Sequence, residues 1–118
     1  AVSRYLLEFP AGTLEKGESP LSSIKREIQE EAGYKANQWD DLGLLVPAPG
    51  YADEEIHLFL ARDLNKLTKQ PIGDPDEDIN IIILDPRKLD KLIASGEEAL
   101  DAKTITAWFR AKQFLNLQ

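Results

Sequence analysis

The sequence contains no cysteine and a single histidine among its 118 residues. Without cysteine the chain can form neither a disulfide nor a thiol nucleophile, and a cysteine-ligated zinc site is excluded. The absence is compatible with a reducing cytosol, and we expect a cytoplasmic protein. Also missing is any apolar run of the roughly 18–20 residues that a membrane span requires, so we expect no membrane partner. The first residues, AVSRYLLEFPAG, resemble a strand more than a signal peptide.

Positive charge is also in short supply, because 14 basic residues face 21 acidic ones and the formal net charge is −7. An acidic surface repels phosphate backbones, which argues against a nucleic-acid partner. Gathered carboxylates can instead hold divalent metals. Hydrophobic residues make up 42% of the chain, which is enough to fill one core, and we expect residues 1–118 to form a single domain.

Apolar runs and turn-forming residues divide the chain into alternating segments. The runs predict strands at residues 4–9, 42–47, 56–61 and 79–84, the last two of them buried. Capping residues predict helices at residues 19–33, 85–96 and 101–115. The polar stretch 63–78 is expected to be a surface loop. This irregular alternation predicts an α/β sandwich with a mixed sheet.

Apolar spacing predicts which side of each helix packs on the core. In the first helix Ser19 and Pro20 form a typical start and Gly33 a typical stop. The residues expected to pack are Leu21, Ile24 and Ile28 in this helix, Leu89, Leu92 and Ile93 in the second, and Ile105, Trp108, Phe109, Ala111 and Leu115 in the third.

The first helix carries a surplus of negative charge on one side. At about 100° per residue, Glu27, Glu30 and Glu31 share an arc of about 100°. Two effects oppose this arrangement. Glu27 and Glu31 repel each other one turn apart, and the C-terminal end of the helix dipole disfavours anions nearby. One interpretation is a solvated acidic face, with Arg26 paired to Glu30. The other is a site for Mg²⁺ or Mn²⁺, which prefer oxygen ligands.

A longer pattern favours the metal site. Gly12, Glu18 and the run Arg26-Glu27-Ile28-Gln29-Glu30-Glu31-Ala32-Gly33-Tyr34 match the Nudix box, G-x5-E-x7-R-E-U-x-E-E-x-G-U, where U is a bulky apolar residue. The sequence therefore resembles a Nudix hydrolase almost to its end. The resemblance implies a Nudix-type α/β/α sandwich with a mixed sheet.

The resemblance also implies roles for the residues of the box. The metal ligands would be Glu27 and Glu31, with Glu30 close by and the backbone carbonyl of Ala11 as a further ligand. The cofactor would be Mg²⁺, which Mn²⁺ can replace, and Glu30 and Glu31 would take part in catalysis. Structural residues of the box would be Gly12, Glu18, Arg26 and Gly33, with Glu18 and Arg26 paired so that they hold the loop on the helix.

Further features are similar to the ADP-ribose pyrophosphatase branch of that family. They are the run Glu8-Phe9-Pro10-Ala11-Gly12 before the box, the proline at position 49, which falls sixteen positions after Gly33, and the segments APGYADEEIHLFLA and DAKTITAW. The branch implies hydrolysis of the pyrophosphate bond of ADP-ribose to AMP and ribose 5-phosphate. The implied partners are a small nucleotide substrate and a second copy of the chain in a homodimer.

The resemblance to this branch also implies that two loops serve the substrate. Pro49, Gly50, Tyr51 and Glu54 would bind it, although the adjacent Asp53 and Glu55 compete with Glu54 for that role. The catalytic base would come from the loop GDPDEDIN, where Glu77 is the first choice and Asp76 and Asp74 follow. His57 lies inside an apolar run and is expected to be a strand residue.

The chain departs from the branch at its beginning. The N-terminal strands that build the dimer and sandwich the adenine are expected to be missing before residue 1, and Arg4 is either a remnant of that substrate site or a surface charge. Two alternatives stay open: a Nudix hydrolase of another nucleoside diphosphate sugar or a dinucleotide, and a non-catalytic domain that senses a nucleotide. Retention of all the box carboxylates favours a hydrolase.

Overall fold

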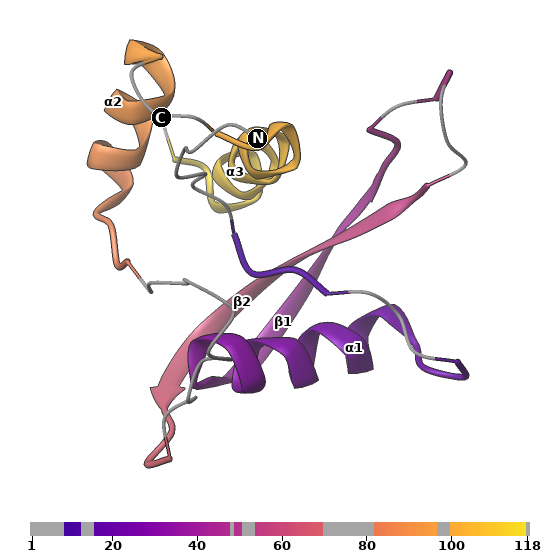
Figure 1. Ribbon diagram of the computed structural model, residues 1–118. Helices are drawn as coiled ribbons and strands as arrows, with labels where there is room; N and C mark the ends of the chain where they lie inside the picture. Colours follow the sequence, from indigo (N-terminus) through magenta and orange to yellow (C-terminus); the bar gives the residue numbers. More distant parts are fainter. Residues whose placement is uncertain are drawn as a thin grey trace, which may run out of the picture. The chain divides into compact units, whose positions relative to one another are not determined.

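The structure is a computed structural model that describes residues 9–12, 16–47, 49–50, 54–69, 82–96 and 100–117. Its elements, in chain order, are helix α1 (Pro20–Glu27), the π-helical turn η1 (Ile28–Ala32), strands β1 (Tyr34–Leu45) and β2 (Ile56–Lys66), and helices α2 (Pro86–Ser95) and α3 (Ala102–Leu115), as Figure 1 shows. The strands form a two-stranded antiparallel sheet, and the chain is of the α/β class. No helix in these ranges is both long and apolar enough to cross a bilayer.

Two compact units make up the chain. One contains Ala1–Phe9, Leu42–Leu58 and Ile82–Gln118, and the other contains Pro10–Asp41 and Phe59–Ile81. Each strand runs from one unit into the other, so both units include one end of the β1–β2 hairpin. That residues 1–118 form a single domain stays a prediction.

The first helix begins and ends where the sequence predicts. Ser19 is its N-cap and accepts the Ser22 backbone N–H at 3.2 Å, and Pro20 occupies the first turn. Helix α1 continues directly into η1, and Gly33 ends η1 at φ 73°, a left-handed conformation that glycine adopts without a steric penalty. The π-helical last turn was not expected; in it the Gly33 N–H reaches both the Gln29 and the Ile28 carbonyl.

The hairpin is longer than the sequence predicts. Strand β1 begins at Tyr34 instead of residue 42, and β2 continues to Lys66, so residues 63–66 belong to a strand and the expected loop is wrong there. Side-chain pairs across the sheet support the extension. Asp40 accepts two hydrogen bonds from Arg62, at 2.7 and 3.1 Å, and Trp39 meets Phe59 edge to face. These pairings join residues far apart in the chain, which local propensity does not register.

A third pair shows the same hairpin bending locally. Asn37 donates to the Asp63 carboxylate at 3.1 Å, and Asp63 itself has φ 58°. Aspartate tolerates this left-handed conformation better than most residues. Of the apolar residues in β2, only Leu58 is fully buried among those that the structure describes, so the expected buried strand is half-buried instead.

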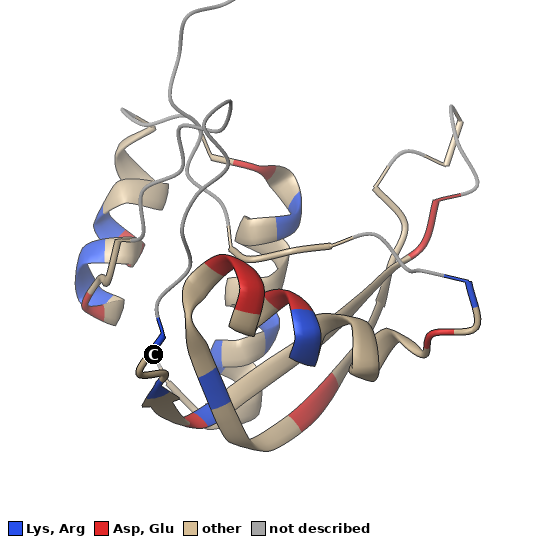
Figure 2. Cartoon of the chain, turned by 60° about the horizontal axis from the view of Figure 1, so that its bottom comes forward, with Lys and Arg blue, Asp and Glu red and all other residues tan. Residues whose placement is uncertain are grey.

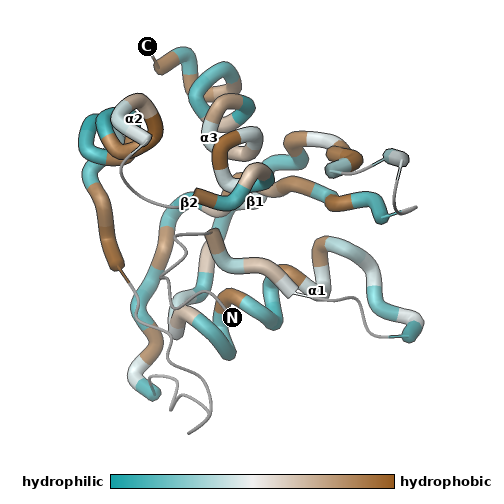
Figure 3. The backbone as a smooth tube through the Cα atoms, turned by 45° about the horizontal axis from the view of Figure 1, so that its top comes forward, coloured by the Kyte–Doolittle hydropathy of each residue, from teal (hydrophilic) through white to brown (hydrophobic). Residues whose placement is uncertain are grey.

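The apolar run at residues 79–84 was expected to be a core strand, and its described part corrects that expectation. Ile82, Ile83 and Leu84 have no strand structure, and the two isoleucines are 60% and 80% exposed. They form the hydrophobic segment that leads into α2 in Figure 3. β-Branched residues favour a strand only where a partner backbone completes the ladder, and among the described residues the sheet consists of β1 and β2. Residues 4–8 of the predicted strand and positions 70–78 of the predicted loop lie outside the described residues, and Phe9 has no strand structure.

Helices α2 and α3 are joined by a polar cluster. Asp85 caps α2, Gly96 ends it at φ 68°, and Leu89 is buried as predicted. Asp90 of α2 accepts hydrogen bonds from the Trp108 indole at 2.8 Å and from Lys112 at 3.0 Å, both in α3. The indole hydrogen bond and the lysine together lower the pKa of the Asp90 carboxyl below its ordinary value.

Helix α3 packs differently from its predicted pattern. Ala111 is buried, but Ile105 is 40% and Phe109 64% exposed, which corrects the expectation that both pack on the core. The most buried residue of α3 is Thr104, at 2% exposure, and its hydroxyl accepts the Phe9 backbone N–H at 3.0 Å. A satisfied hydroxyl can replace an apolar side chain at a buried position.

Arg110 anchors α3 to the end of β1. Its Nη1 donates to the Leu44 carbonyl at 2.7 Å and to the Leu42 carbonyl at 3.2 Å. Between these residues Gly43 has φ 91°, which turns the strand so that both carbonyls face the same cation.

Candidate metal site

The carboxylates of the box are placed by the helix that runs from Pro20 to Ala32. Glu27 is the last residue of α1, whereas Glu30 and Glu31 lie in the π turn. Figure 2 shows acidic residues on this helix next to basic ones. Because i→i+5 hydrogen bonding takes more residues per turn, the angles of an ideal α-helix hold only as far as Glu27. π turns of this kind occur frequently at functional sites.

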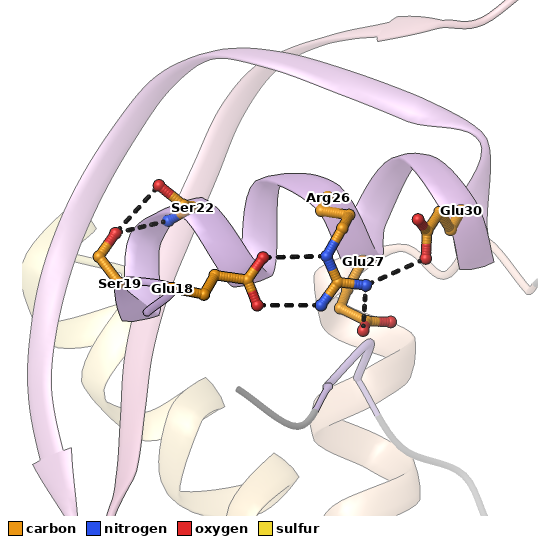
Figure 4. Close-up of polar contacts among 6 residues, drawn as sticks. All are labelled: Glu18, Ser19, Ser22, Arg26, Glu27 and Glu30. Atoms are coloured by element: carbon orange, nitrogen blue, oxygen red, sulfur yellow. Dashed lines mark hydrogen bonds and ion pairs between the residues drawn. The ribbon is translucent and has the colours of Figure 1, made fainter. Parts of the chain in front are cut away.

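Arg26 donates hydrogen bonds to three carboxylates of the box. Its Nε donates to Glu18 Oε2 at 2.9 Å and its Nη2 to Glu18 Oε1 at 3.1 Å. Its Nη1 donates to Glu27 Oε1 at 3.0 Å and to Glu30 Oε2 at 3.2 Å, as Figure 4 shows. The expected Glu18–Arg26 pair is therefore present, and it is bidentate, the geometry that matches a guanidinium to a carboxylate.

Burial differs among these side chains. Glu18 and Glu27 are 14% and 13% exposed, Arg26 is 27% exposed, and Glu30 is 61% exposed. The Glu18 contact is therefore shielded from water, while the Glu30 contact is screened and weak. The guanidinium of Arg26 carries one positive charge and contacts three carboxylates, those of Glu18, Glu27 and Glu30.

Gly12 lies directly against Glu27. A Cβ added at Gly12 would be 2.2 Å from Glu27 Cγ, 2.3 Å from Cδ and 2.6 Å from Oε1. A side chain at position 12 would require Glu27 to shift, so glycine serves a close approach here and not an unusual φ. The contact brings the loop backbone that follows Ala11 to the Glu27 carboxylate. The sequence marked Gly12 as a fixed box position but did not reveal this contact, because it depends on how the loop returns to the helix.

The side chains are chemically suited to a hard divalent cation, because Glu27 and Glu30 both offer carboxylate oxygens and both contact the same guanidinium nitrogen. They do not form a complete cage: among the described residues no group of three or more His, Cys, Asp or Glu side chains is arranged to hold a metal. In this structure a guanidinium nitrogen occupies the position between the two carboxylates. Glu31 is exposed and takes part in another interaction.

The residues expected to bind substrate are only partly described. Pro49, Gly50 and Glu54 are exposed and lie between β1 and β2. His57 is in β2, as its apolar surroundings predict. The other candidates lie outside the described residues: Arg4, Tyr51, Asp53, Asp74, Asp76 and Glu77.

An α/β fold in which a box of carboxylates follows a glycine-containing loop defines the class of this protein. The NUDIX domain model matches residues 2–110, and the chain belongs to that family. The Glu18–Arg26 pair and the Gly12–Glu27 contact are therefore features of a Nudix box.

The chain is also similar to individual proteins of known sequence and structure. Over 119 aligned residues the chain is 37% identical to the ADP-ribose pyrophosphatase of Bacillus subtilis (strain 168), covering 99% of this chain and 64% of the relative. It is 38% identical over 119 residues to the methanol dehydrogenase activator of Bacillus methanolicus, covering 99% and 60%. A solved ADP compounds hydrolase superposes with a TM-score of 0.70 at 25% identity, covering 87% of this chain and 54% of that one. The chain thus spans less than two thirds of the length of these relatives.

Proposed function

We propose that the whole protein is a divalent-metal-dependent Nudix hydrolase that cleaves the pyrophosphate bond of ADP-ribose to AMP and ribose 5-phosphate. The observation that carries this proposal is the contact between Glu27 and the Gly12 backbone, inside a box whose carboxylates are all retained. Similarity to an ADP-ribose pyrophosphatase over 99% of the chain supports the choice of substrate.

The roles of the residues follow from oxygen chemistry. Glu27, Glu30, Glu31 and the Ala11 carbonyl would hold Mg²⁺ or Mn²⁺. A bound divalent ion supplies charge neutralisation for the pyrophosphate and lowers the pKa of water. The chain itself positions these donors: the Gly12 backbone fixes Glu27, and the Glu18–Arg26 pair fixes the loop on the helix.

A carboxylate of the chain would accept the proton of the attacking water. On sequence grounds Glu77 is proposed for this step, with Asp76 and Asp74 as the neighbouring candidates, and Glu30 and Glu31 support catalysis at the metal. Pro49, Gly50, Tyr51 and Glu54 are proposed to bind the substrate.

The test is a substrate panel with the full-length protein. It is incubated with Mg²⁺ and ADP-ribose, other nucleoside diphosphate sugars or dinucleotides, and the products are separated and quantified. We expect AMP and ribose 5-phosphate from ADP-ribose, and no turnover after chelation of the metal. Glu31→Gln is expected to abolish turnover while circular dichroism stays unchanged, whereas the matched control Lys25→Gln, on the same helix, retains it. A fully active Glu31→Gln variant contradicts the metal assignment.

The same panel separates the alternatives. Turnover restricted to another nucleoside diphosphate sugar or to a dinucleotide keeps the chemistry and rejects the substrate. Binding of a nucleotide without turnover of any member identifies a sensor domain, a reading that the retained Glu18, Glu27, Glu30 and Glu31 oppose.

A homodimer and a cytoplasmic location are also part of the proposal. Light scattering on the full-length protein measures its mass in solution, and a monomer mass would reject the dimer. Fractionation of source cells tests the location.

A further inference from the structure

The guanidinium of Arg26 makes two separate sets of contacts. One edge, Nε and Nη2, forms a bidentate contact with Glu18, whose side chain is 14% exposed. The remaining nitrogen, Nη1, lies between Glu27 Oε1 and Glu30 Oε2, at 3.0 and 3.2 Å. A pair that only anchored the loop would need the first edge alone, so the position of Nη1 requires a separate explanation.

We propose that Nη1 of Arg26 is a resident counter-cation for the Glu27–Glu30 pair, which a divalent ion displaces while Nε and Nη2 stay on Glu18. The inference rests on the proposed metal-dependent function. Arg26 is then a positioning residue with two effects: it holds the two carboxylates in place before the metal arrives, and it competes with the metal for them.

Electrostatics supports displacement over coexistence. Glu27 and Glu30 repel each other unless a cation lies between them, and Nη1 supplies that charge. A dication that takes the same oxygens would lie close to the guanidinium, and the two cations would repel. The Glu18 contact is shielded and bidentate, so it persists while the single-nitrogen contacts break.

The two carboxylates differ in how readily they change partner. Glu30 is 61% exposed, and a screened contact at 3.2 Å is released easily. Glu27 is 13% exposed and is confined by the Gly12 backbone, so it stays in place without Arg26. Because Gly12 already fixes Glu27, removal of Arg26 mainly removes the cation that competes with the metal, and it disturbs the position of Glu27 little.

The sign of the effect on metal affinity follows. Removal of the Arg26 charge is expected to strengthen Mn²⁺ binding by about five- to tenfold, the effect of one partly screened charge next to the ligands. If Arg26 only anchors the loop, its removal leaves the affinity unchanged or weakens it. The two roles therefore predict opposite results.

The experiment measures free Mn²⁺ by electron paramagnetic resonance during titration of the full-length protein. The variants are Arg26→Gln, the charge-balanced double variant Glu18→Gln/Arg26→Gln, and Glu18→Gln alone, with Lys25→Gln as the control for loss of one helix charge. Tighter binding is expected for both variants that lack Arg26 and for neither of the others. Circular dichroism is recorded for each.

A second measurement needs no substitution near the metal. Side-chain ¹⁵N resonances of Arg26 are followed in the unsubstituted protein as Mg²⁺ is added, with Arg26→Lys used for assignment. Faster hydrogen exchange at the Nη1 group, with the Nε–H unchanged, is the expected result. Protection of the Nη1 group that persists at saturating Mg²⁺ would overturn the inference even if the variants fail to fold.

The outcomes distinguish this inference from the proposed function. Absence of saturable Mn²⁺ binding to the unsubstituted protein rejects the metal site itself, and the inference with it. Normal, saturable binding that Arg26→Gln leaves unchanged or weakens, in a folded variant, rejects only the role of Arg26.

Discussion

Replacement of Gly12 by alanine is the most direct perturbation of the site. The added methyl carbon would be 2.2 Å from Glu27 Cγ and 2.3 Å from Cδ. Carbon atoms in contact are separated by about 3.5–4.0 Å, so either the loop or the Glu27 side chain has to move by more than about 1 Å. Overpacking of this kind destabilises a protein by about 1–3 kcal/mol.

The functional effect is expected to exceed the effect on stability. If Glu27 is the metal ligand that we propose, its displacement by about 1 Å would lower turnover by roughly 100-fold. We expect Gly12→Ala to weaken Mn²⁺ binding and to lower metal-dependent turnover of ADP-ribose by about that factor, while the melting temperature falls by about 4–15 °C. Mn²⁺ titration, product release and thermal melting measure the three quantities.

Gly17→Ala is the matched control for Gly12→Ala. Gly17 has φ 80° and nothing within 4 Å of its added Cβ, so alanine there introduces backbone strain without touching Glu27. The control is expected to lose stability and to retain Mn²⁺ affinity. A Gly12→Ala protein that binds Mn²⁺ and turns over substrate like the unsubstituted protein would refute the reasoning.

Two further predictions concern the other unit. Hydrogen bonds from Trp108 and Lys112 lower the pKa of the Asp90 carboxyl, so its contribution to stability is complete above the unfolded pKa of 3.8 and is lost as the pH falls through the lower folded pKa. Asp90→Asn should therefore flatten the decline of the melting temperature at acidic pH. An unchanged dependence of the melting temperature on pH would contradict this prediction. Gly43→Ala forces alanine to φ 91° and should destabilise by about 1–2 kcal/mol, measured by urea unfolding, where an unchanged midpoint is the contrary result.

Helix ends were predictable because their signals are local. Ser19 and Asp85 each precede a proline and cap the helix that follows, and Gly33 and Gly96 end those helices in the left-handed conformation. Each signal acts through hydrogen bonds within a few residues, so it needs no information about distant parts of the chain. The π turn at the end of the first helix escaped prediction because no residue type marks it.

Strands were predicted less well because their stabilisation is not local. The residues from Tyr34 to Asp41 lack an apolar alternation, yet they form two thirds of β1 by pairing with β2. Ile82 and Ile83 have strong strand propensity, yet they have no strand structure. At β1 the partner backbone outweighs propensity, and at Ile82 and Ile83 propensity alone does not form a strand.

By itself the sequence determined the family and the identity of the box residues, because their fixed spacing is written in the chain and their oxygen and guanidinium chemistry does not depend on the fold. Only the tertiary structure decided that Gly12 confines Glu27, and that Arg26 reaches Glu18 with one edge and the Glu27–Glu30 pair with the other. Those contacts depend on the path by which the loop returns to the helix, and such a path is fixed by packing and hydrogen bonds between residues that are separated in the chain.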